Sequence, residues 1–167
     1  IEKLRMQLEK VQAQLDAVQD KKDEIIKLQN GKAGTVYVIS NIGSFGDDVF
    51  KIGMTRRLEP MDRIRELSDA SVPFPFDVHS FIFSEDAVAL EANLHRTLNN
   101  KRVNKVNLRK EFFRVSLDEL QTLVEDCDPS AAFNRTALAE QFRQSQSVNE
   151  VPEDVEMDTD DTEEIAA

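Results

Sequence analysis

Gly34-Thr35-Val36-Tyr37-Val38-Ile39-Ser40 and Val49-Phe50-Lys51-Ile52-Gly53 are the two stretches that decide the fold. Both are rich in β-branched and aromatic residues, which favour strands. Residues 41–48 lie between them and contain Gly43 and Gly46, which are typical of a turn. The sequence therefore predicts two strands joined by a hairpin loop.

The residues after the hairpin alternate between helical and extended patterns. They predict helices over 58–67 and 85–98, strands over 76–83 and 112–115, and further helices over 117–124 and 131–142. The resulting order, β-β-α-β-α-β-α, favours a small α/β (α+β) sandwich, with an antiparallel or mixed sheet flanked by helices.

Residues 1–28 predict one long helix that carries a heptad seam. The seam positions alternate three and four apart and are Ile1, Leu4, Leu8, Val11, Leu15, Val18, Lys22 and Ile25, all apolar except Lys22. At about 1.5 Å per residue the helix is about 40 Å long. Because an apolar seam is costly in water, we expect a partner helix, either a second copy or an upstream segment. A homo-oligomer or larger assembly is thus predicted, and a lone solvated helix is the alternative.

The net charge of −11 is unevenly distributed. Residues 144–167 hold nine acids and no Lys or Arg, and without them the net charge is −2. We therefore expect a coiled-coil helix over 1–30, a folded domain over 31–143 and a disordered acidic tail over 144–167. A sharper hypothesis is that the tail folds back on basic residues and mimics DNA.

The single cysteine, Cys127, excludes an internal disulfide and a multi-cysteine zinc site and weakly favours a reducing compartment. No stretch approaches the roughly 18 apolar residues that a membrane helix needs, and no signal peptide is visible. We therefore expect a cytoplasmic protein. The chain starts at Ile1 inside a helical pattern, so we expect a fragment of a longer protein, whose upstream part could still carry a membrane anchor.

Five motifs between Gly34 and Arg114 together resemble the GIY-YIG nuclease superfamily. The motifs are Gly34-Thr35-Val36-Tyr37, Lys51-Ile52-Gly53, Pro60 to Arg63, Leu90-Glu91-Ala92-Asn93-Leu94-His95 and Glu111-Phe112-Phe113. Each is weak alone, but their order on the predicted elements makes the resemblance fairly specific. More specifically, it looks like the phage and bacterial branch in which K-I-G replaces Y-I-G.

The resemblance implies a role for three residues. Tyr37 matches a tyrosine thought to help activate water, Arg63 an arginine that clamps the scissile phosphate, and Glu91 the metal-binding carboxylate. One carboxylate with waters and phosphate oxygens suits Mg²⁺ or Mn²⁺. A tyrosine with a pKa near 10 is a poor base, so we expect Lys51 on the adjoining strand to lower the pKa of Tyr37.

His95 lies four residues after Glu91, which puts both on one face of a helix. It could orient Glu91, bind phosphate or act as an alternative base. The predicted catalytic set is Tyr37, Lys51, Arg63, Glu91 and His95. Lys51 stands where the superfamily has its second tyrosine, and its late asparagine could correspond to any of Asn104, Asn107 and Glu111. His79 is expected to be structural.

A basic loop is predicted between the second helix and the last strand. Residues 99–110 contain no acid, and the loop carries Lys101, Arg102, Lys105, Arg109 and Lys110. We expect these residues, with Arg56 and Arg57, to contact DNA phosphates, which fixes position but not sequence. The alternative is a solvated surface. No helix-turn-helix or zinc finger is visible, so little sequence specificity is expected.

These observations favour a divalent-metal-dependent endonuclease that hydrolyses DNA phosphodiester bonds. The resemblance to bacterial and phage proteins that join a coiled coil to this domain implies defence against foreign (phage) DNA or phage DNA processing. The alternative is a non-catalytic DNA-binding or oligomerisation module that retains the nuclease fold. A third possibility is a stalk and adaptor that binds no nucleic acid.

Overall fold

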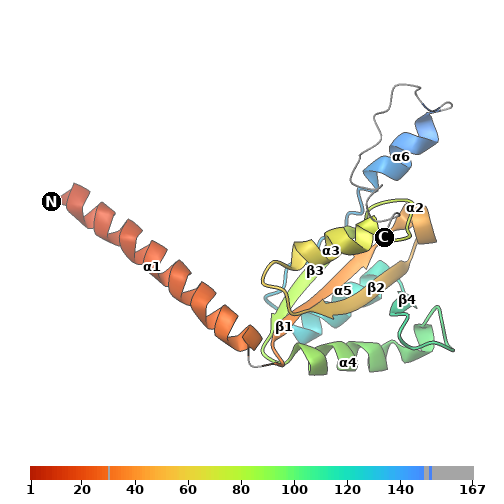
Figure 1. Ribbon diagram of the computed structural model, residues 1–167, viewed down its shortest axis with the longest axis horizontal. Helices are drawn as coiled ribbons and strands as arrows, with labels where there is room; N and C mark the ends of the chain where they lie inside the picture. The colour runs from red at the N-terminus through yellow and green to blue at the C-terminus, as the bar shows by residue number, and fades with distance from the viewer. Residues whose placement is uncertain (30, 149–150, 152–167) are drawn as a thin grey trace, which may run out of the picture.

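Four antiparallel strands form one sheet with the order β3-β1-β2-β4 in the computed structural model (Figure 1). The structure describes residues 1–29, 31–148 and 151, with the side chains of 24–29 left undescribed. The elements are α1 (Glu2–Gln29), β1 (Gly34–Ser40), α2 (Ile42–Phe45), β2 (Val49–Thr55), α3 (Pro60–Asp69), β3 (Asp77–Ser84), α4 (Ala87–Thr97), a 3-10 turn (Asn99–Lys101), β4 (Phe112–Arg114), α5 (Leu117–Cys127) and α6 (Glu140–Ser147). The predicted fold class is confirmed.

Two apolar layers hold helices against the sheet, because side chains alternate between its faces. One layer surrounds Val36, Val38 and Ile52 and packs against α4 and α5. The other surrounds Tyr37 and Ile39 and packs against α3. Figure 1 shows α3 on the side of the sheet opposite α4, while α1 projects away from it.

Strand β2 is paired along its full length on one side only. Its partner β1 runs from Thr35, opposite Thr55, to Ser40, opposite Phe50. On the other side β4 pairs only with Val49–Lys51. The Ile52 N–H still donates to the Glu111 carbonyl at 3.2 Å, just before β4 begins, but no described strand pairs with this edge of β2 beyond Ile52.

The predicted hairpin loop contains a capped helical turn. The Oδ1 atom of Asn41 accepts the Ser44 N–H at 3.3 Å, and its Nδ2 donates to the Phe74 carbonyl at 2.6 Å. Gly46 ends the turn with φ +84°, a conformation that glycine adopts at little cost. The buried Asn41 therefore joins the hairpin to the segment before β3.

The predicted helix over 131–142 is wrong for most of its length. Residues 131–139 run along the outer edge of β3, and only α6 is helical. The Asn134 N–H donates to the His79 carbonyl at 2.7 Å, and the Ser80 hydroxyl donates to the Ala132 carbonyl at 2.8 Å. Partners on β3 thus satisfy backbone groups that a helix would pair internally.

The predicted acidic tail lies almost wholly outside the described residues. Helix α6 includes residues 144–147, while 149, 150 and 152–167 are not described. Within the described part, no helix is long and apolar enough to cross a membrane.

Candidate active site

Helix α4 supplies two side chains to the open edge of β2. The His95 Nε2–H donates to the Ile52 carbonyl at 2.7 Å. Glu91, one turn earlier, accepts a hydrogen bond from the Met54 backbone N–H. Unpaired backbone groups in a protein interior are costly, so these bonds fix α4 against the strand. They align a carboxylate and an imidazole along the edge.

Glu111 is the third member of this cluster and was missed as a site residue by sequence reasoning. Potential ligand atoms of Glu91, His95 and Glu111 all lie within 4.8 Å of one another. Glu111 also forms an ion pair with Lys51 at 3.2 Å. The sequence did hold one indication of its role. Glu111 comes directly before the last strand, and that strand pairs with β2, which carries Lys51. From the sequence, Glu111 was only one of three candidates for the position of the late asparagine.

Burial and a neighbouring carboxylate make ionisation of Glu91 costly in this cluster. Burial and then the charge of Glu111 raise the pKa of Glu91 to about 7, although Lys51 and the Met54 hydrogen bond lower it. Burial lowers the pKa of His95, which favours its neutral imidazole. Because Nε2 donates to Ile52, the lone pair of the neutral ring lies on Nδ1. Two crowded carboxylates and one nitrogen donor fit a divalent cation such as Mn²⁺, and Mg²⁺ less well.

Tyr37 reaches the same edge from the opposite face of the sheet. It is the cross-strand partner of Gly53, and a Cβ atom on Gly53 would lie 2.6 Å from the Tyr37 Cζ atom. The glycine is therefore required because the phenol ring lies directly on its backbone. This placement brings the Tyr37 hydroxyl close enough to Glu111, Arg63 and Glu91 to sense their charges.

The prediction that Lys51 lowers the pKa of Tyr37 is wrong. Burial, followed by the charge of Glu111, raises the pKa of Tyr37 to about 12, although the charge and hydrogen bond of Arg63 oppose the rise. Lys51 is paired with Glu111 and is not among the main causes of the shift. In this arrangement Tyr37 is a neutral hydroxyl that can donate a hydrogen bond.

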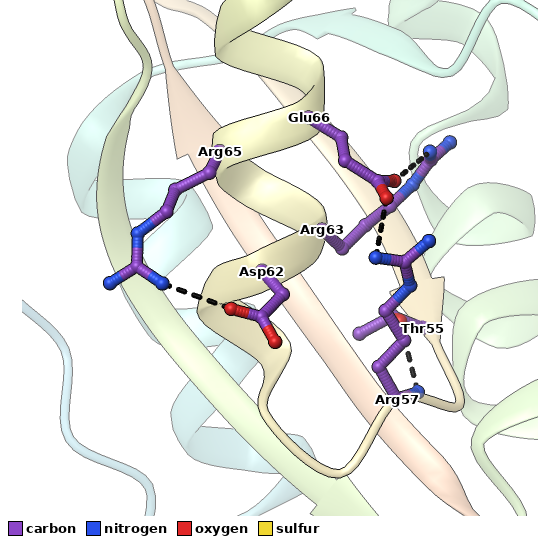
Figure 2. Close-up of polar contacts among 6 residues, drawn as sticks. All are labelled: Thr55, Arg57, Asp62, Arg63, Arg65 and Glu66. Atoms are coloured by element: carbon purple, nitrogen blue, oxygen red, sulfur yellow. Dashed lines mark hydrogen bonds and ion pairs between the residues drawn. The ribbon is translucent and has the colours of Figure 1, made fainter.

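Arg63 projects from α3 toward this edge and is held by Glu66. The Arg63 Nη1 atom donates to Glu66 at 3.1 Å, and Arg57 pairs with the same carboxylate (Figure 2). Arg65 instead pairs with Asp62 on the other side of the helix (Figure 2). Arg63 remains 41% exposed, so an anion can reach it. A bound phosphate would compete with the Glu66 carboxylate for the Arg63 guanidinium.

The structure separates the predicted DNA-binding cations into groups. Arg102 is 9% exposed, donates to the Leu108 carbonyl at 3.2 Å and covers the Phe113 ring, so it anchors the basic loop. Lys101 pairs with Glu119 at 2.8 Å on the surface.

Three more of these cations are exposed within the loop, and two lie outside it. Lys105 donates to the Asn100 carbonyl at 3.2 Å, while Arg109 and Lys110 line a groove of about 290 Å³ together with Lys51 and Glu111. Arg57 pairs with Glu66, as described above. Arg56 is exposed and also interacts with another part of the protein. Arg109 and Lys110 are thus the loop cations nearest the acidic cluster.

His79 lies apart from this site, as predicted for a structural histidine. It is 3% exposed, its Nδ1 donates to the Asn134 carbonyl at 2.6 Å, and its Nε2 lies 2.7 Å from the Ser40 hydroxyl. Both nitrogens are therefore occupied within the fold.

Residues 34–128 match the family model of the T5orf172 domain, which covers more than half of the chain. The chain belongs to the T5orf172 domain family. This is a GIY-YIG/HNH-like, phage-associated family of nuclease-type domains. The matched T5orf172 region contains every member of the edge cluster as well as Tyr37 and Arg63. No curated protein and no solved structure gives a match.

Proposed function

We propose that this T5orf172 domain is a GIY-YIG-type endonuclease that uses a divalent metal ion to hydrolyse DNA phosphodiester bonds. One observation carries the proposal. Tyr37 and Arg63 from one face of the sheet meet Glu91, His95 and Glu111 from the other at the open edge of β2. Such convergence provides cation ligands, a phosphate-binding group and a hydroxyl in one place.

The cation proposed for this site is Mn²⁺ or Mg²⁺, held by carboxylate oxygens of Glu91 and Glu111 and by the Nδ1 atom of His95. When bound, such an ion lowers the pKa of water and neutralises charge on the phosphate. Its charge would also relieve the repulsion between the two carboxylates. Lys51 holds Glu111 in position through their 3.2 Å ion pair.

Two other residues act on the substrate directly. The Arg63 guanidinium would donate two parallel hydrogen bonds to the scissile phosphate and stabilise the charge that grows during attack. Tyr37, neutral because its pKa is about 12, would donate a hydrogen bond to a phosphate oxygen or to the attacking water. Its ring is fixed against Gly53, which keeps the hydroxyl in one position.

Plasmid cleavage tests the proposal. The whole chain is incubated with supercoiled plasmid and Mn²⁺ or Mg²⁺, beside Glu91→Gln, Arg63→Ala and Arg65→Ala. We expect the first two variants to lose roughly 10²-fold or more in rate. Arg65→Ala is the matched control, because Arg65 lies on the same helix but pairs with Asp62. Binding without cutting under either metal would support the non-catalytic module, and no binding at low salt would support the adaptor.

We also propose that α1 joins this chain to a second copy. Its described seam residues are all exposed, from Val11 at 51% to Ile1 at 99%. Pairing two such helices would bury the seam, as in a coiled coil. The DNA that is cut would be foreign or phage DNA, in keeping with a phage-associated family.

A further inference from the structure

The basic loop carries an apolar tip beside the candidate active site. Val106 is 95% exposed, and among the large apolar side chains described only Ile1 at the chain start is more exposed. Leu108, two residues later, is also exposed. Isolated surface apolar residues are ordinary, but these two lie between Lys105 and Arg109 on a segment that contains no acid from 99 to 110.

Hydrogen bonds hold the tip in one shape. The Asn104 Oδ1 atom accepts the N–H groups of Val106 at 3.0 Å and Asn107 at 2.8 Å. The Asn107 Oδ1 atom then accepts the Arg109 N–H at 3.1 Å. Val106 is therefore presented by an organised turn, and its exposure follows from the backbone geometry.

The base of the loop is fixed to the edge that forms the site. The Val103 N–H donates to the Phe112 carbonyl at 3.0 Å, and Arg102 bridges to Phe113. The loop ends at Lys110, directly before Glu111. Five residues span at most about 18 Å, so Val106 lies within about five base pairs of a phosphate bound at the cluster.

We propose that Val106 is an apolar wedge that enters the minor groove of duplex DNA near the cut and unstacks one base step. Lys105, Arg109 and Lys110 contact the flanking phosphates. Apolar side chains between base steps, with cations on the backbone, are a general means of bending DNA. The proposal rests on the proposed function and adds a residue that selects deformable DNA at the cleavage point.

The test uses duplexes with 2-aminopurine at each position within about eight base pairs of the mapped cut. Binding is measured on the Glu91→Gln chain, which we expect to bind DNA without cutting it, and on the same chain carrying Val106→Ser, Val106→Leu or Val148→Ser. Val148 is a surface valine at the end of α6 and serves as the matched control. We expect a fluorescence rise of severalfold at one step, lost with Val106→Ser and kept with the other two.

Affinity and salt dependence separate the wedge from simple charge attraction. Val106→Ser should weaken binding by about tenfold, the effect of exposing one buried valine, without changing the salt slope. Lys110→Ala should lower that slope by about one.

Three results would overturn the proposal. They are an absent fluorescence rise, equal affinity of Val106→Ser and Val148→Ser, or Val106-dependent binding to anionic lipid vesicles without base unstacking. If the unsubstituted chain cleaves plasmid but one of these three results is obtained, the proposed role of Val106 is wrong and the proposed function stands. If it neither cleaves nor binds DNA, the proposed function fails first.

Discussion

Tyr37 and Gly53 act as one unit at the residue scale. The strand pairing places them opposite each other, and the absent side chain of Gly53 lets the phenol ring lie on the backbone of β2. The ring can then extend to the edge where Arg63 and Glu91 influence its hydroxyl. A residue without a side chain therefore positions a candidate catalytic group.

Gly53→Ala should displace Tyr37 while leaving the fold intact. The added Cβ would lie 2.6 Å from the Tyr37 Cζ atom, so the ring must move. We expect a cost of about 1–3 kcal/mol in the free energy of unfolding and loss of most plasmid cleavage. Urea unfolding and cleavage rate are measured together. Gly46→Ala, with φ +84° but open space around it, should be destabilised with cleavage retained; equal cleavage by both variants would contradict the prediction.

Glu91 makes the stability of the metal-free domain depend on pH. Its pKa rises from 4.5 to about 7 on folding, so the folded chain binds more protons than the unfolded chain between these values. The free energy of unfolding should therefore fall as pH rises through this window. Glu91→Gln can still accept from Met54 but carries no charge, and it should lose less stability from pH 5 to pH 8.

Urea unfolding at pH 5 and pH 8, with and without Mn²⁺, measures this effect. Mn²⁺ should stabilise the unsubstituted chain at pH 8 far more than at pH 5, because it favours the ionised carboxylate. The Glu91→Gln chain should respond weakly at both. Parallel pH profiles for the two chains would contradict the assignment.

At the scale of elements, a helix covers one exposed edge of the sheet and an extended segment covers the other. Beyond Lys51 the edge of β2 is covered by α4, whose His95 and Glu91 pair with backbone groups. The outer edge of β3 is covered by residues 131–139, which are joined to it through His79 and Ser80. Glu91, His95 and Glu111 bring their potential ligand atoms together at the first of these edges, which is why the candidate site lies there.

His79→Phe should weaken the cover over β3 without affecting chemistry. Phenylalanine preserves ring packing against Phe50 and Phe133 but leaves the Ser40 hydroxyl and the Asn134 carbonyl without the histidine as partner. We expect a loss of about 2–4 kcal/mol in the free energy of unfolding and faster proteolysis within 131–139. Cleavage by the folded fraction should be unchanged, and a tenfold loss would show that His79 serves the site.

For the whole molecule, the question is what α1 pairs with. The helix projects from the sheet (Figure 1), and its Lys21 forms a surface ion pair at 3.3 Å with Glu59, the residue just before α3. Such exposed pairs contribute little. The seam is therefore free to hold a second helix, which would place two nuclease-type domains on one stalk.

Leu8→Lys should convert a dimer of this chain into a monomer. Leu8 is a seam residue that is 70% exposed, and Met6 is equally exposed at 69% but lies outside the seam. A lysine at the seam would face its own copy, whereas Met6→Lys would face water. Light scattering coupled to size exclusion should give the monomer mass for Leu8→Lys alone. A monomer for the unsubstituted chain at micromolar concentration would contradict self-pairing.

Local patterns were sufficient for much of the fold. Alternation predicted β1, β2 and β3, and helical periodicity predicted α1, α3, α4 and α5, with boundaries that differ by a few residues. The helix over 131–142 was wrong, because its apolar pattern packs against β3 and that strand supplies its hydrogen-bond partners. The local sequence of a segment does not reveal hydrogen-bond partners that lie far away along the chain.

The sequence by itself determined the hairpin, the order of the elements and the facing pair of Glu91 and His95, because these depend on spacing within one helix or strand. Only the tertiary structure decided that Glu111 joins them, since Lys51 lies 60 residues earlier in the chain. It also decided the protonation of Tyr37, which depends on burial and on charges from three other segments. Charges interact across the distance in space that separates them, and for residues far apart in the sequence that distance is set only when the chain folds.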